Sequence, residues 1–143
     1  MDKITLGWRE WVALPELGIS RIKAKVDTGA RTSALHAFFI EPLKSRKQIR
    51  FGIHTLQDSL QDDLICVADV IDERNVTDSG GHTERRWVIR TPLLVGNRIW
   101  PIEITLTNRD IMKFRMLLGR TALKHQFMVD PSRSYLAGEP QPG

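Results

Sequence analysis

Apolar residues alternate with charged or polar ones along most of the chain, the period that places successive side chains on opposite faces of a β-strand. In residues 21–26, Ile22, Ala24 and Val26 share one face and three cations share the other. Residues 100–106 show the same alternation. Further strands are expected at residues 8–14, 34–40, 48–54, 64–71 and 85–95.

Turn-forming residues separate these runs, at residues 15–18, 78–81 and 95–98. The last turn joins two long runs and is typical of a β-hairpin. Pro101 has no N–H to donate, so the strand it begins is expected to start at a sheet edge. A short helix is expected at residues 120–126, with a helical turn at 108–114 as the other candidate. Many short strands with little helix predict an all-β barrel or folded sheet.

The size of the chain suits one domain. It has 143 residues, 41% of them apolar, which is enough for a core without cross-links. We expect this domain to occupy residues 1–137, because residues 138–143 are polar and rich in Pro and Gly and are expected to be disordered. The net charge of +4 suits an acidic partner, but no basic segment interleaved with aromatic residues points to nucleic acid.

The single cysteine, Cys66, excludes an intrachain disulfide and a zinc ribbon. A reducing, cytoplasmic location is therefore expected. Cys66 lies in the longest apolar run, residues 64–68, so it is expected to be a buried, unreactive thiol. That run is far shorter than the roughly 20 residues of a membrane span, and the N-terminus lacks the apolar core of a signal peptide.

The candidate catalytic residues are Asp27, Thr28 and Gly29, at the point where the alternation of residues 21–26 stops. These three residue types suit aspartic peptidase chemistry. Asp27 places a carboxylate directly after a buried strand, the Thr28 hydroxyl can hold a neighbouring loop, and Gly29 has no Cβ to block close backbone approach. Two such carboxylates share one proton, so that one activates water while the other polarises the scissile carbonyl. The triplet alone is also ordinary hairpin chemistry. The apolar run of residues 114–118, followed by Gly119 and a helix start, favours the catalytic interpretation.

Together these segments resemble the retroviral-type aspartic peptidases, the retropepsins, in which an Asp-Thr-Gly-Ala loop is followed, after a flap hairpin, by two apolar residues, Gly and Arg. Residues 7–11, 23–37 and 116–135 are also similar to the bacterial family named ATP-dependent zinc proteases. That family is associated with the ATP-grasp ligase that adds glutamates to a ribosomal protein. The resemblance implies an all-β, retropepsin-like closed barrel with one short C-terminal helix. It also implies peptidase activity and a glutamate ligase as partner. It is weakest at residues 41–63, which are left unassigned.

The zinc and ATP of that family name have no matching motif in this sequence. A His-Glu-x-x-His helix motif and a phosphate-binding Gly-Lys-Ser/Thr loop are both absent. A discontinuous zinc site of Asp27, His36 and Cys66 stays open, although no cofactor is predicted. The four histidines lie far apart in sequence, at His36, His54, His82 and His125.

A second Asp-Ser/Thr-Gly pattern occurs at Asp78, Ser79 and Gly80, 51 residues after Asp27. It follows a polar segment, residues 72–77, and the separation is too short for two lobes of about 100 residues each. A flap hairpin at residues 78–82 is therefore the favoured interpretation. The second catalytic carboxylate is then expected from another copy of the chain in a homodimer.

Candidate substrate-contacting residues follow the Asp27 loop or flank the predicted flap. They are Arg31, Thr32, Ser33, Gly80, Gly81, Arg85 and Arg86. Residues 31–33 could instead be a solvent-exposed start of a strand, and Arg85 and Arg86 could instead be charged residues in the stem of the flap hairpin, with no contact to substrate. With the implied ligase association, the arginines suggest an acidic or glutamylated peptide substrate. The predicted function is hydrolysis of peptide or glutamyl amide bonds, with a non-catalytic module for the ligase, or a zinc-dependent protease, as the alternatives.

Overall fold

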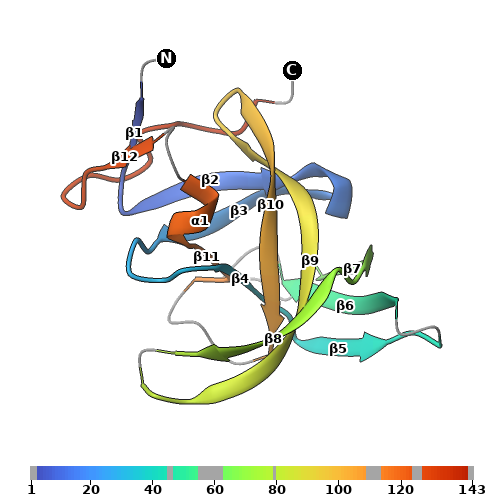
Figure 1. Cartoon of the computed structure of the whole chain (residues 1–143). Coiled ribbons are helices and arrows are strands. Elements are labelled where there is room, and N and C mark those ends of the chain that lie inside the picture. The colour runs from blue at the N-terminus through green and yellow to red at the C-terminus, as the bar shows by residue number, and fades with distance from the viewer. Residues whose placement is uncertain are drawn as a thin grey trace.

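The computed structural model describes residues 3–44, 47–54, 63–78, 80–108, 114–123 and 127–141, and within them the chain is built almost wholly of β-strands (Figure 1). The helical elements are the 3₁₀ turn η1 (Pro15–Leu17) and the helix α1 (Arg120–Leu123). In chain order the strands are β1 (Ile4–Leu6), β2 (Arg9–Leu14), β3 (Ile19–Val26), β4 (Ser33–His36), β5 (Phe39–Pro42), β6 (Gln48–His54), β7 (Asp63–Asp69), β8 (Asp72–Thr77), β9 (Thr83–Val95), β10 (Arg98–Thr107), β11 (Met116–Leu118) and β12 (Phe127–Val129).

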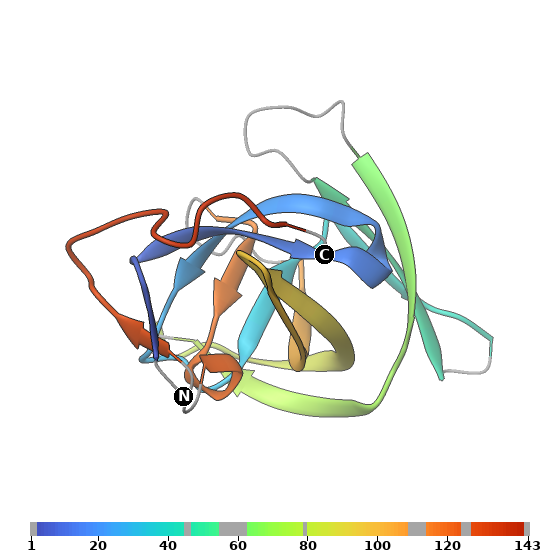
Figure 2. The same cartoon turned by 90° about the horizontal axis from the view of Figure 1, so that it is seen from above.

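Six strands form a hydrogen-bonded ring. The order β10-β4-β11-β3-β2-β9 returns to its start because β9 also pairs with β10 (Figure 2). β8 extends β9 beyond the ring, β5, β6 and β7 form a second sheet, and β1 pairs with β12. The predicted nearly all-β architecture with one short helix is confirmed.

The alternation in residues 21–26 has the predicted effect. Ile22 and Ala24 are fully buried and Val26 is nearly so, while the cations between them remain partly or fully exposed. Apolar burial of this kind is the main term that stabilises a fold. β3 is therefore fixed in the ring with the end of the strand, Val26, directly before Asp27.

One predicted strand is wrong in its extent. The apolar run of residues 34–40 is divided between β4 and β5, because the chain leaves the ring at this point. The N–H of Ala37 donates to the carbonyl of Thr107 in β10, whereas the N–H of Phe38 donates to the carbonyl of Gly52 in β6. Periodicity alone does not reveal such a change of partner. Within the unassigned residues 41–63, the described residues contain the end of β5, all of β6 and the first residue of β7, while residues 43, 44 and 47 lie outside the strands.

The β9–β10 hairpin was predicted correctly. Its turn is Gly96-Asn97, with Gly96 at φ 58°, in the left-handed region. Pro101 faces Pro92 of β9, and β10 begins to pair with β4 only at Ile104, so the start of β10 is an edge as expected. The helix expected from residue 120 begins there, while residues 124–126 and most of the candidate turn at 108–114 lie outside the described residues.

The C-terminal segment is held against the ring by a buried carboxylate. Glu10, fully buried, accepts the N–H groups of Leu136 at 2.9 Å and Ala137 at 3.0 Å. Further along, within the part of the expected tail that the structure describes, the N–H of Gln141 donates to the carbonyl of Gly96 at 2.7 Å. Among the described residues, no helix has the length and apolar character to cross a bilayer.

Candidate active site

Asp27 lies directly after β3, where two distant segments meet. Its N–H donates to the carbonyl of Leu118 at 2.9 Å, because β11 pairs in parallel with β3. The Asp27 side chain is half-buried, and its Oδ1 accepts the N–H of Gly29 at 3.1 Å. Thr28 and Gly29 are exposed. The structure thus joins the Asp27 loop to the downstream apolar segment that the sequence singled out.

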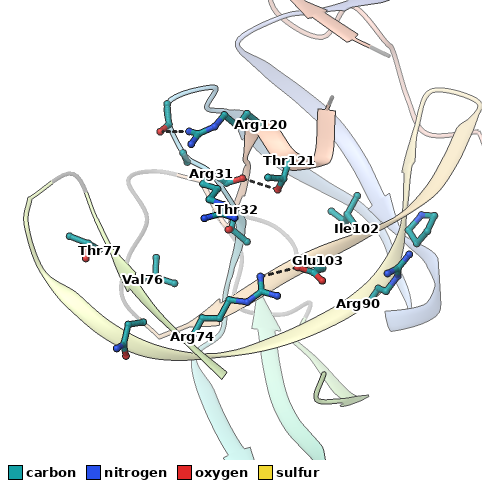
Figure 3. A pocket seen from close by; sticks show the side chains of 14 residues that line it. Arg31, Thr32, Arg74, Val76, Thr77, Arg90, Ile102, Glu103, Arg120 and Thr121 are labelled. Atoms are coloured by element: carbon teal, nitrogen blue, oxygen red, sulfur yellow. Dashed lines mark hydrogen bonds and ion pairs between the residues drawn. The ribbon is translucent and has the colours of Figure 1, made fainter. Parts of the chain in front are cut away.

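The start of α1 holds the loop from behind. The N–H of Arg120 donates to the carbonyl of Ala30 at 2.8 Å, and its guanidinium donates to the carbonyl of Gly29 at 3.2 Å. The hydroxyl of Thr121 donates to the carbonyl of Arg31 at 2.7 Å (Figure 3). Three successive loop carbonyls are therefore fixed by two residues of one helix, which gives the loop a defined geometry.

Gly119 closes the contact between α1 and the loop. A Cβ at this position would lie 2.6 Å from the carbonyl carbon of Thr32 and 2.9 Å from its nitrogen, so glycine is required by space. The N–H of Gly119 donates to Oγ of Ser33 at 3.0 Å. Ser33 is fully buried, and its carbonyl accepts the Thr105 hydroxyl at 3.1 Å. The structure therefore places Ser33 in the support of the loop, away from the pocket.

A pocket of about 980 Å³ opens beside the Asp27 loop (Figure 3). One wall comes from the loop and α1, the other from β8, and parts of β9 and β10 complete it. Its lining residues are Gly29, Ala30, Arg31, Thr32, Arg74, Asn75, Val76, Thr77, Arg90, Pro101, Ile102, Glu103, Arg120 and Thr121. Of the predicted substrate residues, Arg31 and Thr32 line it. Asp27 lies next to this lining, two residues before Gly29.

The second Asp-Ser-Gly pattern forms the tip of the β8–β9 hairpin. Oδ1 of Asp78 accepts the N–H of Gly80 at 2.9 Å and the N–H of His82 at 2.9 Å, so this carboxylate closes the turn. Gly80 and Gly81 are exposed, and Gly81 has a φ of 84°. The predicted hairpin is present, and its tip projects to the same side of the molecule as the loop after β3 (Figure 1). Ser79 lies outside the described residues.

Two further predicted substrate residues lie along β9 and do not line the pocket. Arg85 is exposed and pairs with Glu73 at 2.6 Å. Arg86 is buried, pairs with Glu84 at 2.6 Å and donates to the hydroxyl of Thr105 at 3.4 Å. In this arrangement Arg86 supports the stem of the hairpin from inside.

The pocket also contains three arginines that were not among the predicted substrate residues, Arg74, Arg90 and Arg120. Arg74 pairs with Asp72 at 2.7 Å and with Glu103 at 2.8 Å. The hydrogen bonds that Arg74 donates to Glu103 and Asp72 raise the pKa of its guanidinium, and Arg74 in turn lowers the pKa of Asp72. The position of Arg74 opposite the Asp27 loop follows from the register of β8 with β9, which no local pattern reveals.

The residues considered for zinc do not come together as a site. No group of three or more His, Cys, Asp and Glu side chains that could hold a metal occurs in the described ranges, and His125 lies outside them. Cys66 donates to the carbonyl of Leu17 at 3.4 Å, and burial raises the pKa of its thiol to about 11. Cys66 is therefore a neutral, buried thiol, as predicted.

Comparison with known proteins connects this architecture to a family. A family model described as the retropepsin-like aspartic endopeptidase RimB matches residues 5–140. A crystal structure of a Legionella pneumophila protein of unknown function covers 95% of this chain and 99% of its own, with a TM-score of 0.76 and 24% identity. At that identity the likeness shows the shared fold.

Curated relatives are similar over nearly the whole chain. Proteins named probable alpha-L-glutamate ligase from Shewanella pealeana and Parasynechococcus marenigrum are 45% and 46% identical over 140 and 139 residues, 96% of this chain in both cases. The chain spans about a third of the length of these relatives, 31% and 30% respectively.

Proposed function

The chain belongs to the RimB-like family of retropepsin-like proteins, and from this premise we propose that it is an aspartic endopeptidase in which Asp27 is the catalytic carboxylate. The observation that carries the proposal is the position of Asp27, half-buried at the end of β3 on a loop that Leu118, Arg120 and Thr121 hold in place. A carboxylate used as a general base must be both accessible and fixed, and this arrangement supports both.

The reaction needs two carboxylates that share one proton. The ionised one takes a proton from water, and the water oxygen attacks the carbonyl carbon of the scissile amide. The protonated one donates a hydrogen bond to the carbonyl oxygen, and the amide nitrogen then receives a proton as the carbon–nitrogen bond breaks. In this proposal Gly29 holds Oδ1 of Asp27 through its N–H. The exposed Thr28 beside it keeps its predicted role, in which its hydroxyl holds a neighbouring loop.

We propose that the second carboxylate is Asp27 of a second copy, related by two-fold symmetry. The other aspartate with the same sequence pattern, Asp78, uses its carboxylate to close the hairpin turn through Gly80 and His82. A homodimer therefore completes the dyad without a second catalytic loop in one chain. The β8–β9 hairpin, with Gly80 and Gly81 at its tip, serves as the flap over the substrate.

The substrate and partner are proposed from the relatives. The Shewanella pealeana protein named probable alpha-L-glutamate ligase contains a region 45% identical to this chain within a polypeptide about three times as long. A peptidase domain beside a ligase that attaches glutamate suits a substrate with peptide or glutamyl amide bonds and acidic side chains. We propose the ligase as its functional partner and the cytoplasm as the site of the reaction.

Mixing wild type with Asp27→Asn tests both the residue and the shared dyad. Asp27→Asn alone should lose turnover of a glutamate-rich peptide. After subunit exchange between equal amounts of the two chains, activity should be about a quarter of that of wild type at the same total chain concentration, because only dimers with two Asp27 residues act. A fall to about one half would mean that each chain acts alone.

Inhibitors separate the chemical classes in the same assay. A statine-type inhibitor should block turnover by mimicking the tetrahedral intermediate, while a chelator should leave it unchanged. Inhibition by the chelator alone would support a zinc-dependent protease. No turnover of any peptide, together with altered ligase activity on adding the chain, would support a non-catalytic module.

A further inference from the structure

The pocket beside the Asp27 loop is strongly cationic. Four arginines from four separate segments line it, and Glu103 is the one carboxylate among the described lining residues. The arginines are Arg31 after the loop, Arg74 on β8, Arg90 on β9 and Arg120 on α1. A concave surface with one sign of charge concentrates ligands of the opposite sign.

These arginines differ in what they already bind. Arg31 and Arg90 are exposed, and within the described ranges no carboxylate lies within ion-pair distance of either. Arg74, by contrast, is held between Asp72 at 2.7 Å and Glu103 at 2.8 Å. Figure 3 shows the Arg74 guanidinium directed toward Glu103, across the pocket from the loop. Glu103 therefore occupies a position that suits a ligand carboxylate.

We infer that this pocket binds a carboxylate side chain of the peptide substrate, and that the substrate's carboxylate replaces Glu103 on Arg74. The inference rests on the proposed function and deepens it, because it names the subsite and the residues that select an acidic peptide. Arg90 and Arg31 attract the carboxylate, and Arg74 exchanges one carboxylate partner for the other. Guanidinium groups suit this exchange because their planar donors bind carboxylates in two parallel hydrogen bonds.

The pocket is correctly placed for a residue near the scissile bond. Gly29 and Arg31, two and four positions after Asp27, lie in its lining. On the opposite wall, Val76 and Thr77 come directly before the hairpin tip. An extended peptide between flap and loop advances about 3.3 Å per residue, so a side chain within a few residues of the cleaved amide reaches the pocket.

The Arg74–Glu103 pair can be removed with little risk to the fold. Both side chains are more than a third exposed, at 37% and 38%, and pairs of this exposure contribute little to stability. A neighbouring ion pair across the β8–β9 hairpin, Arg85 with Glu73, lies outside the pocket lining, and its carboxylate side chain has an exposure similar to that of Glu103, at 36%. Glu103→Gln and Glu73→Gln therefore form a matched test and control that change the net charge equally.

The experiment measures binding of fluorescein-labelled tetraglutamate and tetraglutamine peptides by fluorescence anisotropy, with Asp27→Asn as the background so that no peptide is cleaved. Arg90→Gln should weaken tetraglutamate binding about fivefold, the effect of one partly exposed charge-assisted contact. Glu103→Gln should tighten it about threefold, because Arg74 no longer has to release an internal partner. Tetraglutamine binding should not respond, and Glu73→Gln should leave both affinities unchanged.

Three results would overturn the inference: equal binding of the two peptides, no gain in Glu103→Gln, or the same gain in Glu73→Gln, which would indicate a general charge effect. The binding assay does not depend on turnover. If the wild type cleaves no peptide while the predicted binding pattern holds, the proposed peptidase function fails and the subsite stands. If cleavage occurs without the pattern, the subsite alone is wrong.

Discussion

Asp27-Thr28-Gly29 and Asp78-Ser79-Gly80 have the same sequence pattern and make the same local contact. In both, Oδ1 of the aspartate accepts the N–H of the glycine two residues later, at 3.1 Å for Asp27 and 2.9 Å for Asp78. The difference lies in what supports each turn. Asp27 follows a central strand and receives support from β11 and α1, whereas the Asp78 carboxylate closes its own hairpin turn through the N–H groups of Gly80 and His82.

The Asp-Thr/Ser-Gly triplet therefore specifies a turn, and the elements packed around the turn specify whether it is a site. A hairpin tip is held by its own cross-strand pairs, so it can move as a unit over a substrate. The loop after β3 is bonded to residues about 90 positions away, on α1, so it cannot move without breaking these bonds. A general base needs the second kind of support, and a flap needs the first.

The largest expected difference between the two turns is in activity. Asp27→Asn should lower kcat/KM on a glutamate-rich peptide by about 1,000-fold or more, because it removes the proton-accepting group. Asp78→Asn keeps an oxygen that accepts the same N–H groups, so its activity should stay within about threefold of wild type. A comparable loss in both variants would mean that Asp78 takes part in the chemistry.

The second largest difference is expected in stability, when a methyl group is added to a glycine that contacts each turn. Gly119→Ala places Cβ 2.6 Å from the Thr32 carbonyl carbon, so the free energy of unfolding should fall by about 3 kcal/mol. At Gly80 the nearest atoms, belonging to Asp78 and His82, lie 3.4 Å away, so Gly80→Ala should cost less than about 0.5 kcal/mol. Urea unfolding monitored by tryptophan fluorescence measures both. Equal losses would contradict the difference in support.

The third difference concerns hydroxyl groups. Ser33→Ala leaves the buried N–H of Gly119 without its acceptor and should destabilise the fold by about 2 kcal/mol. In the hairpin, the exposed hydroxyls of Thr77 and Thr83 lie 2.8 Å apart, and Thr83→Ala should cost less than about 1 kcal/mol. The same unfolding assay applies. A smaller effect at Ser33 than at Thr83 would show that the loop does not depend on this buried contact.

The smallest expected effect is a pH dependence at the base of the hairpin. Arg74 lowers the pKa of Asp72 in the folded chain, so the pair stabilises the fold at pH values above the unfolded pKa of about 4. This contribution is lost as the pH falls through the folded pKa. Wild type should therefore have a slightly higher urea midpoint than Asp72→Asn at pH 7, and the gap should close near pH 2. A gap that persists at low pH would mean that the charge of Asp72 is not its cause.

Local pattern was sufficient for much of the fold. The alternation in residues 21–26 predicted β3 and its buried face, and Gly96-Asn97 predicted the β9–β10 hairpin. The Asp27 loop and the apolar segment before Gly119 were both recognised, and the structure joins them. These features depend on side-chain period and turn chemistry, which neighbours in the sequence determine.

Other features depended on partners that are distant in sequence. Residues 34–40 gave one apolar run, yet their backbone bonds divide between β10 and β6. Ser33 and Arg86 looked like candidates for substrate contact, but packing against β10 buries both. Arg74 and Arg90 carried no local signal, because their place in the pocket comes from strand register.

The sequence by itself determined several of the strands, most of the turns between them, and that Asp27 is the aspartate preceded by a buried strand. The tertiary structure alone decided which loop is supported from behind and which arginines face the pocket. The physical reason is the distance along the sequence over which each kind of interaction acts. Side-chain alternation and turn conformation act over a few residues. The parallel pairings of β3 with β11 and of β4 with β10 join segments about 90 and about 70 residues apart.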